Sequence, residues 1–114
     1  MVISQGDVWW ADLDPPKGSE AGYRRPVIVV QGNNFNHSQL ATAVCVPLTG
    51  NLRVANVPGN VRLSDRSTGL PRDSVANVAQ VFAVNRTAFL ECVGQLSEAK
   101  LNLVLAGIDV VLGR

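Results

Sequence analysis

The sequence predicts a mostly β fold with a C-terminal helix, arranged as a small antiparallel barrel. Short apolar segments recur between glycine, proline and asparagine residues, which is typical of strands joined by turns. No long helical pattern separates these segments, so local antiparallel pairing is favoured over a parallel sheet. Since 114 residues can fill one hydrophobic core but not two, we expect a single domain over residues 1–114.

Three strands are expected in the first half of the chain. The aromatic and apolar segment 8–13 is followed by Asp14 and two prolines, which end the strand because proline cannot continue a sheet ladder. The segment 27–31 is apolar without alternation, which indicates a strand covered on both faces. A third strand over 42–48 ends at Thr49 and Gly50.

The second half is expected to hold a long loop and three further strands. Residues 51–60 are typical of a loop, and the strands are predicted at 61–63, 75–84 and 90–94. Two cysteines, Cys45 and Cys92, fall inside these apolar segments. Their spacing matches no metal or redox motif, so both are expected to be buried, reduced thiols.

The last segment predicts a helix that packs on the barrel. Ser97 is a suitable N-cap and Glu98 suits the positive end of the helix dipole. An apolar stripe follows at helical spacing, formed by Leu101, Leu105, Ile108 and Leu112. Val104 and Val111 widen this stripe, so the extra apolar surface either covers the barrel or meets another subunit.

Arg25 stands out because it precedes a proline at the start of the second strand. Proline disfavours the helical region for the residue before it, so Arg25 should be extended, while Gly18 and Gly22 loosen the preceding loop. A guanidinium is always charged and offers a planar set of donors that fits phosphate. The expected target is therefore a phosphodiester.

The overall charge excludes a purely electrostatic nucleic-acid binder. Ten Lys and Arg residues face nine Asp and Glu residues, a net charge of +1. A local positive groove stays open as an alternative to ordinary surface charge, because six arginines fall in or beside predicted loops: Arg24, Arg25, Arg53, Arg62, Arg66 and Arg72. No leader or membrane-spanning stretch is evident, so a soluble cytoplasmic protein without a metal cofactor is expected.

An ordered set of short motifs resembles the MazF/PemK family of toxin endoribonucleases. The motifs are GDVWWADL at 6–13, GSE at 18–20, RPVIV at 25–29, PLT at 47–49, DSV at 73–75 and QV at 80–81. The resemblance implies an SH3-like barrel of the CcdB/PemK type that forms a homodimer. It also implies metal-independent cleavage of single-stranded RNA, with messenger RNA the expected target, and neutralisation by a cognate antitoxin.

The same resemblance implies which residues carry the activity. Arg25 matches the catalytic arginine of the family and Thr49 the catalytic threonine, while Ser19, Glu20 and Gln80 fall where relatives line the RNA groove. The chain departs from the family pattern in two places. One extra residue lies between Gln31 and Thr49, and Ala79 replaces the acidic residue that many relatives carry before the glutamine. The preferred RNA sequence should differ accordingly.

A metal-free ribonuclease lets the ribose 2′-hydroxyl attack phosphorus, leaving a 2′,3′-cyclic phosphate and a 5′-hydroxyl. Arg25 fits stabilisation of the phosphoryl charge, because deprotonating it to act as a base would cost roughly 7 kcal/mol at neutral pH. Thr49 can donate a hydrogen bond that positions the phosphate. The base is left open among Glu20, Asp73 and His37.

Trp9 and Trp10 point to opposite faces of one strand, so at most one should be core while the other stacks on a base or meets a partner.

Two alternative functions are also considered. A CcdB-like gyrase poison fits poorly, since the chain ends in VVLGR without the aromatic tail of such toxins. A noncatalytic SH3-like module that binds RNA or peptide does not explain Arg25 and Thr49 together.

Overall fold

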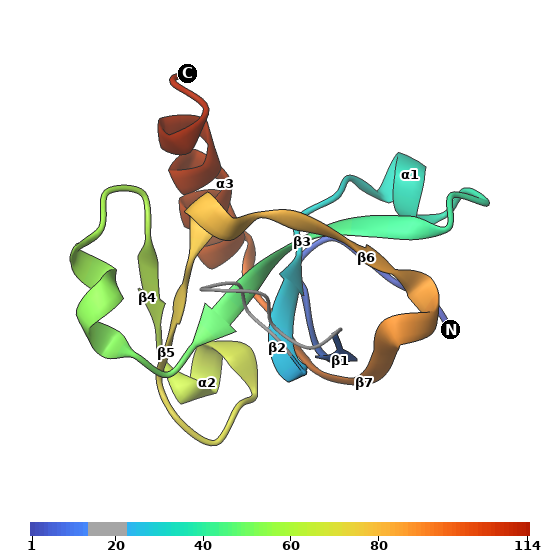
Figure 1. Cartoon of the computed structure of the whole chain (residues 1–114), viewed down its shortest axis with the longest axis horizontal. Helices are drawn as coiled ribbons and strands as arrows, with labels where there is room; N and C mark the ends of the chain where they lie inside the picture. The colour runs from blue at the N-terminus through green and yellow to red at the C-terminus, as the bar shows by residue number, and fades with distance from the viewer. Residues whose placement is uncertain (14–22) are drawn as a thin grey trace.

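The computed structural model describes residues 1–13 and 23–114 and shows a curled antiparallel sheet with a C-terminal helix (Figure 1). The sheet order is β4-β5-β3-β2-β1-β7, and β6 pairs with β3 outside this path. The mostly β prediction is therefore confirmed. The strands are β1 (Asp7–Asp12), β2 (Arg24–Val29), β3 (Thr42–Thr49), β4 (Val61–Leu63), β5 (Ser74–Ala76), β6 (Phe82–Asn85) and β7 (Phe89–Gln95).

Short helical turns connect the strands. The expected loop at 51–60 contains the 3₁₀ helix η1 (Leu52–Asn56), whose N-cap Asn51 accepts a hydrogen bond from Arg53 N at 3.2 Å. The other turns are α1 (Asn33–Asn36), α2 (Asp65–Thr68), η2 (Val78–Gln80) and η3 (Arg86–Ala88). Each is too short to give a helical pattern in the sequence.

The central strands β1, β2 and β3 are covered on both faces, as predicted for the second strand. Val27, Ile28 and Val29 are all fully buried. Alternating side chains of these strands enter two separate core clusters. One includes Val8, Ile28, Val46, Leu48, Leu63, Val78 and Val104. The other includes Ile3, Trp9, Val27, Val29, Cys45, Val84 and Phe89.

The prediction of one continuous strand over 75–84 is wrong, because η2 separates β5 from β6. Both short strands lie along the same edge of β3, with β5 beside its C-terminal part and β6 beside its N-terminal part (Figure 1). Pro47 lies between the two paired stretches, and its carbonyl accepts a hydrogen bond from Asn77 N at 3.0 Å. Since proline has no N–H to return, the ladder stops there and the chain turns.

The outer strands β4 and β7 are bridged by α2, which follows β4 in the chain and packs against β7. The approach is close, since a Cβ added to Gly94 would lie 2.4 Å from the carbonyl oxygen of Thr68. Cys92 lies on β7 and is exposed, whereas Cys45 is buried. The expectation that both thiols are buried is therefore wrong for Cys92, because β7 ends the sheet and one of its faces meets solvent.

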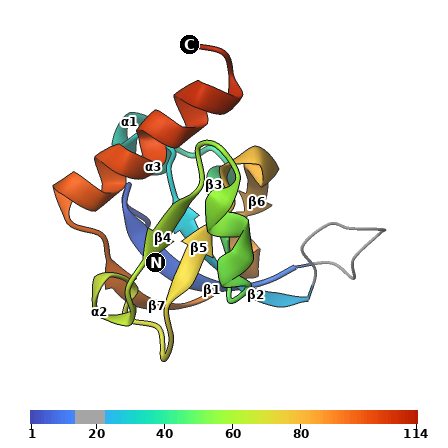
Figure 2. The same cartoon turned by 90° about the vertical axis from the view of Figure 1, so that its left-hand side faces the viewer.

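Helix α3 (Glu98–Val111) packs against β4 and η2 (Figure 2). Its N-cap Ser97 accepts a hydrogen bond from Lys100 N at 3.2 Å, as predicted. Val104 and Gly107 form the centre of its buried face. The helix lies so close to the chain at Gly59 that a Cβ added to Gly107 would clash with the Gly59 carbonyl oxygen.

Leu101, Leu105 and Ile108 pack on the core, but Leu112 follows the end of α3 and is 61% exposed. The predicted stripe is therefore one residue too long. No helix within residues 1–13 and 23–114 is long and apolar enough to span a bilayer.

Candidate active site

The candidate site is a pocket of about 750 Å³ at the ends of β2 and β3. β1 contributes one side chain to its wall, β2 and β3 contribute the residues at their ends, and the loop before β5 closes the remaining side. The lining residues are Trp10, Arg24, Arg25, Pro26, Leu48, Thr49, Gly50, Leu52 and 70–74.

Arg25 and Thr49 meet in this pocket because of the register of two strands. The β2–β3 ladder ends where Val27 pairs with Pro47. Two residues farther along each strand, the same antiparallel register places Arg25 opposite Thr49. Arg25 is half-buried and lies within β2, so the prediction of an extended arginine at the start of a strand is confirmed.

The hydroxyl group of Thr49 has a defined partner. Its oxygen accepts a hydrogen bond from Asn51 N at 3.2 Å. Since a hydroxyl can accept and donate at once, its hydrogen stays available for a group in the pocket. Thr49 also pairs with Val75 of β5, so its backbone is held by the sheet while its side chain reaches the pocket.

Positive charge dominates the lining of the pocket. Three guanidinium groups line it, those of Arg24, Arg25 and Arg72. Among the described lining residues Asp73 is the one carboxylate, and Arg62 Nη2 lies 3.2 Å from its Oδ2. At neutral pH the pocket is therefore cationic and suited to a phosphodiester.

Asp73 is a poor candidate for a catalytic base. Its Oδ1 accepts a hydrogen bond from Asp65 N at 3.0 Å. This bond, together with the guanidinium of Arg62, holds the pKa of the Asp73 carboxyl below its ordinary value. A carboxylate whose pKa is lowered is a weaker proton acceptor. Asp73 instead ties its loop to the first residue of α2 through the hydrogen bond from Asp65 N.

Ser74 places a buried hydroxyl in the pocket wall. The residue is 4% exposed, and its Oγ has no hydrogen-bond partner among the described residues. Ser74 is the first residue of β5, next to the Val75 that pairs with Thr49. A buried polar atom without a partner is uncommon in native proteins, and this one belongs to a residue that lines the pocket.

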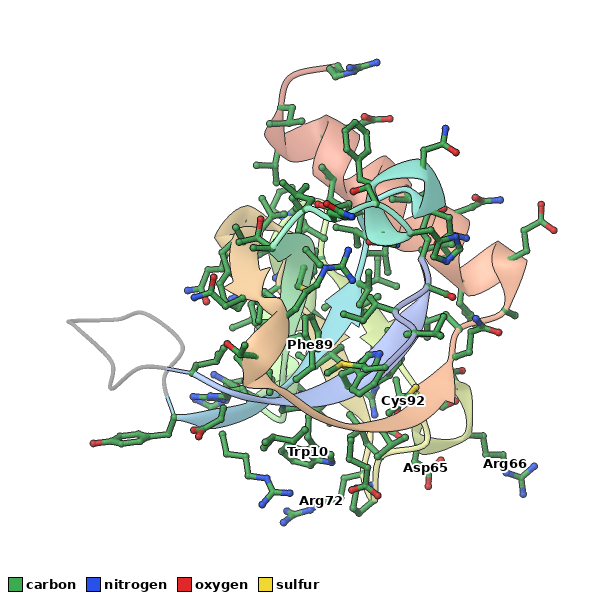
Figure 3. All side chains as sticks on the ribbon, turned by 90° about the vertical axis from the view of Figure 1, so that its right-hand side faces the viewer. Trp10, Asp65, Arg66, Arg72, Phe89 and Cys92 are labelled. Carbon is green, nitrogen blue, oxygen red and sulfur yellow. The ribbon has the colours of Figure 1, made fainter. Side chains whose placement is uncertain are left out.

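The two adjacent tryptophans occupy different surroundings, as predicted. Trp9 is 7% exposed, its ring packs edge-on against Phe89 at 5.4 Å between centroids, and its Nε1 donates to Asp7 Oδ2 at 3.2 Å. Trp10 is half-buried and lines the pocket, at the same end of the molecule as Arg72 (Figure 3). The Arg24 guanidinium carbon lies over the Trp10 ring, 5.6 Å from its centroid.

The structure does not bring every predicted residue to the pocket. Gln80 is exposed at the end of η2, and the exposed His37 caps the C-terminus of α1, both outside the described lining. Ser19 and Glu20 lie outside the described residues. Sequence reasoning named Arg72 for a local positive groove and Asp73 as a candidate base, but it missed that residues 70–74 together form one wall of the pocket. The signal for it was an arginine after Pro71 in a segment that had no assigned element.

No cluster of three or more histidine, cysteine, aspartate or glutamate side chains within the described part of the chain is placed to hold a metal ion. The cysteines do not contribute to the pocket. Burial raises the pKa of the Cys45 thiol to about 12, so that thiol stays protonated. The chemistry offered by the described lining is therefore that of arginine and hydroxyl groups.

Comparison with known proteins gives one consistent family. Residues 4–112 match the model of the PemK-like, MazF-like toxins of type II toxin-antitoxin systems. The chain is 43% identical over 112 residues to the endoribonuclease MazF6 of Mycobacterium tuberculosis strain H37Rv, covering 98% of each chain.

Solved structures of two proteins share the fold. The crystal structure of MazF from Deinococcus radiodurans gives a TM-score of 0.82 at 22% identity, over 100% of this chain and 99% of that one. A mycobacterial endoribonuclease in complex with its cognate antitoxin gives a TM-score of 0.77 at 22% identity, over 97% and 95% of the two chains. These likenesses support the curled sheet with a C-terminal helix.

Proposed function

The chain belongs to the family of PemK-like, MazF-like toxins of type II toxin-antitoxin systems, and we propose that Arg25 and Thr49 carry its endoribonuclease activity. The observation that carries this proposal is the position of Arg25 opposite Thr49 in a pocket with two further arginines. Residues 1–114 would then act as a single toxin domain that inhibits translation by cutting RNA.

The proposed substrate is single-stranded RNA, in particular messenger RNA. A duplex would present its phosphates on a rigid, wide surface, whereas a pocket of about 750 Å³ takes up one or two nucleotides of an unpaired strand. The cationic lining attracts the backbone, and its exposed arginines, Arg24 and Arg72, provide contacts that do not depend on sequence.

In the proposed reaction the ribose 2′-oxygen attacks the adjacent phosphorus and the bond to the 5′-oxygen breaks. Arg25 donates to the phosphoryl oxygens, where negative charge grows in the transition state. Thr49 is held by Asn51 N and donates its own hydrogen to the same group. The 2′-hydroxyl proton leaves with the base and a proton reaches the 5′-oxygen, which yields a 2′,3′-cyclic phosphate and a 5′-hydroxyl.

Of the three candidates for the base, the lowered pKa of Asp73 argues against that residue, and His37 lies outside the described lining of the pocket. Glu20 therefore remains our candidate, because it precedes Arg25 in the segment that leads into β2. Gln80 and Ser19 are retained as proposed RNA-binding residues. No metal cofactor takes part in this proposal.

A cognate antitoxin is the proposed protein partner. A segment with acidic and apolar side chains would suit the arginine-rich pocket and compete with RNA for it.

We also propose that the protein is a homodimer and that it acts in the cytoplasm. The dimer is supported by α3 and its end, which expose apolar side chains at Leu103, Val110, Val111 and Leu112. Light scattering at micromolar concentration should report twice the mass of one chain; a monomer would contradict the dimer.

The test of the function uses purified protein and a long RNA. Primer extension should show discrete cuts that share a short motif, and the cuts should persist in excess EDTA. The 3′ product should accept phosphate from a kinase directly, as a 5′-hydroxyl does. Activity that disappears with the chelator and returns with magnesium would contradict the metal-free reaction.

A further inference from the structure

We propose that Trp10 is a stacking platform for an unpaired RNA base next to the phosphate that is cut. This inference rests on the proposed function, and it adds a substrate-positioning residue to the site. It starts from the difference between the two adjacent tryptophans, since Trp9 completes the core while Trp10 lines the pocket.

The position of Trp10 in the sheet puts its ring close to the reacting groups. Trp10 pairs with Pro26 of β2, and the next pair of the same ladder joins Ala11 to Arg25. The two side chains leave opposite faces of the sheet, but both residues line the pocket at the ends of the strands. An RNA strand whose phosphate reaches Arg25 therefore passes the pocket wall that holds the Trp10 ring.

The packing of Trp10 leaves ring surface available. Its ring packs against the edge of the core cluster that contains Val8 and Ile28, which fixes its orientation. On the solvent side the Arg24 guanidinium lies over the ring. Arg24 is exposed, and no ion pair within the described residues holds it. A cation over an exposed ring is a weak contact, so a base can take this place.

Arg24 and Arg72 give the platform the surroundings that a nucleotide requires. When a base lies on the ring, the Arg24 guanidinium is free to move to a phosphate oxygen, a stronger partner for it than an exposed ring. Arg72 also lines the pocket, at the same end of the molecule as Trp10 (Figure 3). A pocket that offers both an aromatic ring and arginines matches the way single-stranded nucleic acid is bound, with charges along the backbone and rings under the bases.

A protein segment could also place an apolar side chain on Trp10. The pocket favours RNA, because its described lining carries three guanidinium groups, and its carboxylate is already paired with Arg62. An RNA strand carries one phosphate per nucleotide, so it can supply an anionic partner to more than one of these guanidinium groups. Contact of Trp10 with a peptide but not with RNA is therefore an outcome that would overturn the proposal.

Fluorescence gives a direct test, because the chain has two tryptophans. Trp9→Phe leaves Trp10 as the reporter, and Trp10→Phe leaves Trp9. Each variant is titrated with an RNA of mapped cut site whose ribose at that site is 2′-deoxy, so that it binds without being cut. Stacking should quench the emission of Trp10 and leave that of Trp9 unchanged. Binding seen by anisotropy without quenching of Trp10 would overturn the proposal.

Kinetics provide the second arm. Trp10→Leu keeps apolar volume but removes the ring, so KM for RNA should rise about tenfold while kcat changes less than about twofold. Trp10→Phe keeps a ring and should restore most of the loss. Trp9→Phe is the matched control from the opposite face, and its cleavage per folded molecule should equal that of the wild type. Equal KM for Trp10→Leu and wild type would overturn the proposal.

An RNA with single abasic nucleotides locates the stacked base. One abasic position beside the cut should raise KM for the wild type by about tenfold, and the same position should have little effect on Trp10→Leu, because the two changes remove the same contact. Additive losses at every position would contradict stacking. The failure of wild type to cut any RNA would instead contradict the proposed function, so the two failures are distinguishable.

Discussion

Arg25 and Arg86 are both half-buried arginines beside a strand, yet their guanidinium groups make different contacts. Arg86, in η3, donates from its guanidinium to the backbone carbonyls of Leu40, Phe35 and Asn36. Its own N–H also donates to Ala41 O at 2.9 Å. Arg86 thereby joins the segment after α1 to the end of β6.

Arg25 has no hydrogen bond or ion pair from its guanidinium to any described residue. Arg25 lines a pocket that Arg24 and Arg72 also make cationic, so its donors stabilise no described part of the protein. An arginine whose N–H groups are bonded to backbone carbonyls supports the fold. An arginine in a concave site whose N–H groups have no partner in the described structure is available to bind a ligand. Mutations should therefore separate stability from cleavage at these two positions.

The largest effect is expected from Arg25→Ala. Losing one preorganised donor to a transition-state oxyanion should reduce cleavage at least about a hundredfold. Because no core cavity opens, the free energy of unfolding should change by no more than roughly 1 kcal/mol. Arg25→Lys should also be badly impaired, since an ammonium cannot form the bidentate fork. Arg24→Ala, measured in parallel by gel assay, should lose less.

A smaller loss is expected when the Thr49 hydroxyl is removed. Thr49→Val keeps the shape of the side chain and should cut RNA about tenfold to a hundredfold more slowly, because the donor to the phosphate is gone. Thr49→Ser keeps the hydroxyl and should retain most activity. Single-turnover rates on one RNA compare the variants. If Thr49→Val cut as fast as the wild type, Thr49 would have no catalytic role.

The opposite result is expected for Arg86. Arg86→Ala leaves three backbone carbonyls without their charged donor, and should lower the free energy of unfolding by roughly 1–2 kcal/mol. Urea unfolding measures this. Cleavage per folded molecule should be unchanged. Arg66→Ala is the control, since Arg66 is exposed on α2 and should alter neither quantity. A loss of activity in folded Arg86→Ala would weaken the comparison.

The smallest effect is expected from the Arg62–Asp73 pair. The folded pKa of Asp73 lies below its ordinary value of 3.8, so its contribution to stability is present above that pH and is lost as the pH falls through the folded pKa. Arg62→Ala should therefore be slightly less stable than the wild type at pH 7. The gap between their melting temperatures should close as the pH falls through the folded pKa of Asp73. A gap that is constant over this range would mean that the pair does not hold the Asp73 pKa down.

The parts of the site predicted from the sequence are those with a local cause. Pro26 forces Arg25 into an extended conformation, and Gly50 follows the strand that ends at Thr49. The arrangements that the sequence could not supply depend on distant contacts. Arg72 was named as a loop arginine, but its place beside Arg25 follows from the β4–β5 and β3–β5 pairings. The partners of Arg86 precede it by 46 to 51 residues.

The error at 75–84 has the same origin. The apolar pattern alone continues through Val84, and the interruption comes from Pro47 on the neighbouring strand. Strand pairing between distant segments cannot be derived from the periodicity of either one. Cys92 illustrates the point on a smaller scale, since its exposure follows from the place of β7 at the end of the sheet order.

The most direct measurement compares Arg25→Ala and Arg86→Ala on one RNA, at a temperature where circular dichroism shows both to be folded. Single-turnover cleavage should fall at least about a hundredfold for Arg25→Ala and stay within about twofold of the wild type for Arg86→Ala. Both variants should bind an RNA whose ribose at the cut site is 2′-deoxy. Binding shows that the variant is folded, so a loss of cleavage then reports a loss in the chemical step. Near wild-type cleavage by Arg25→Ala would contradict the assignment of Arg25 to the active site.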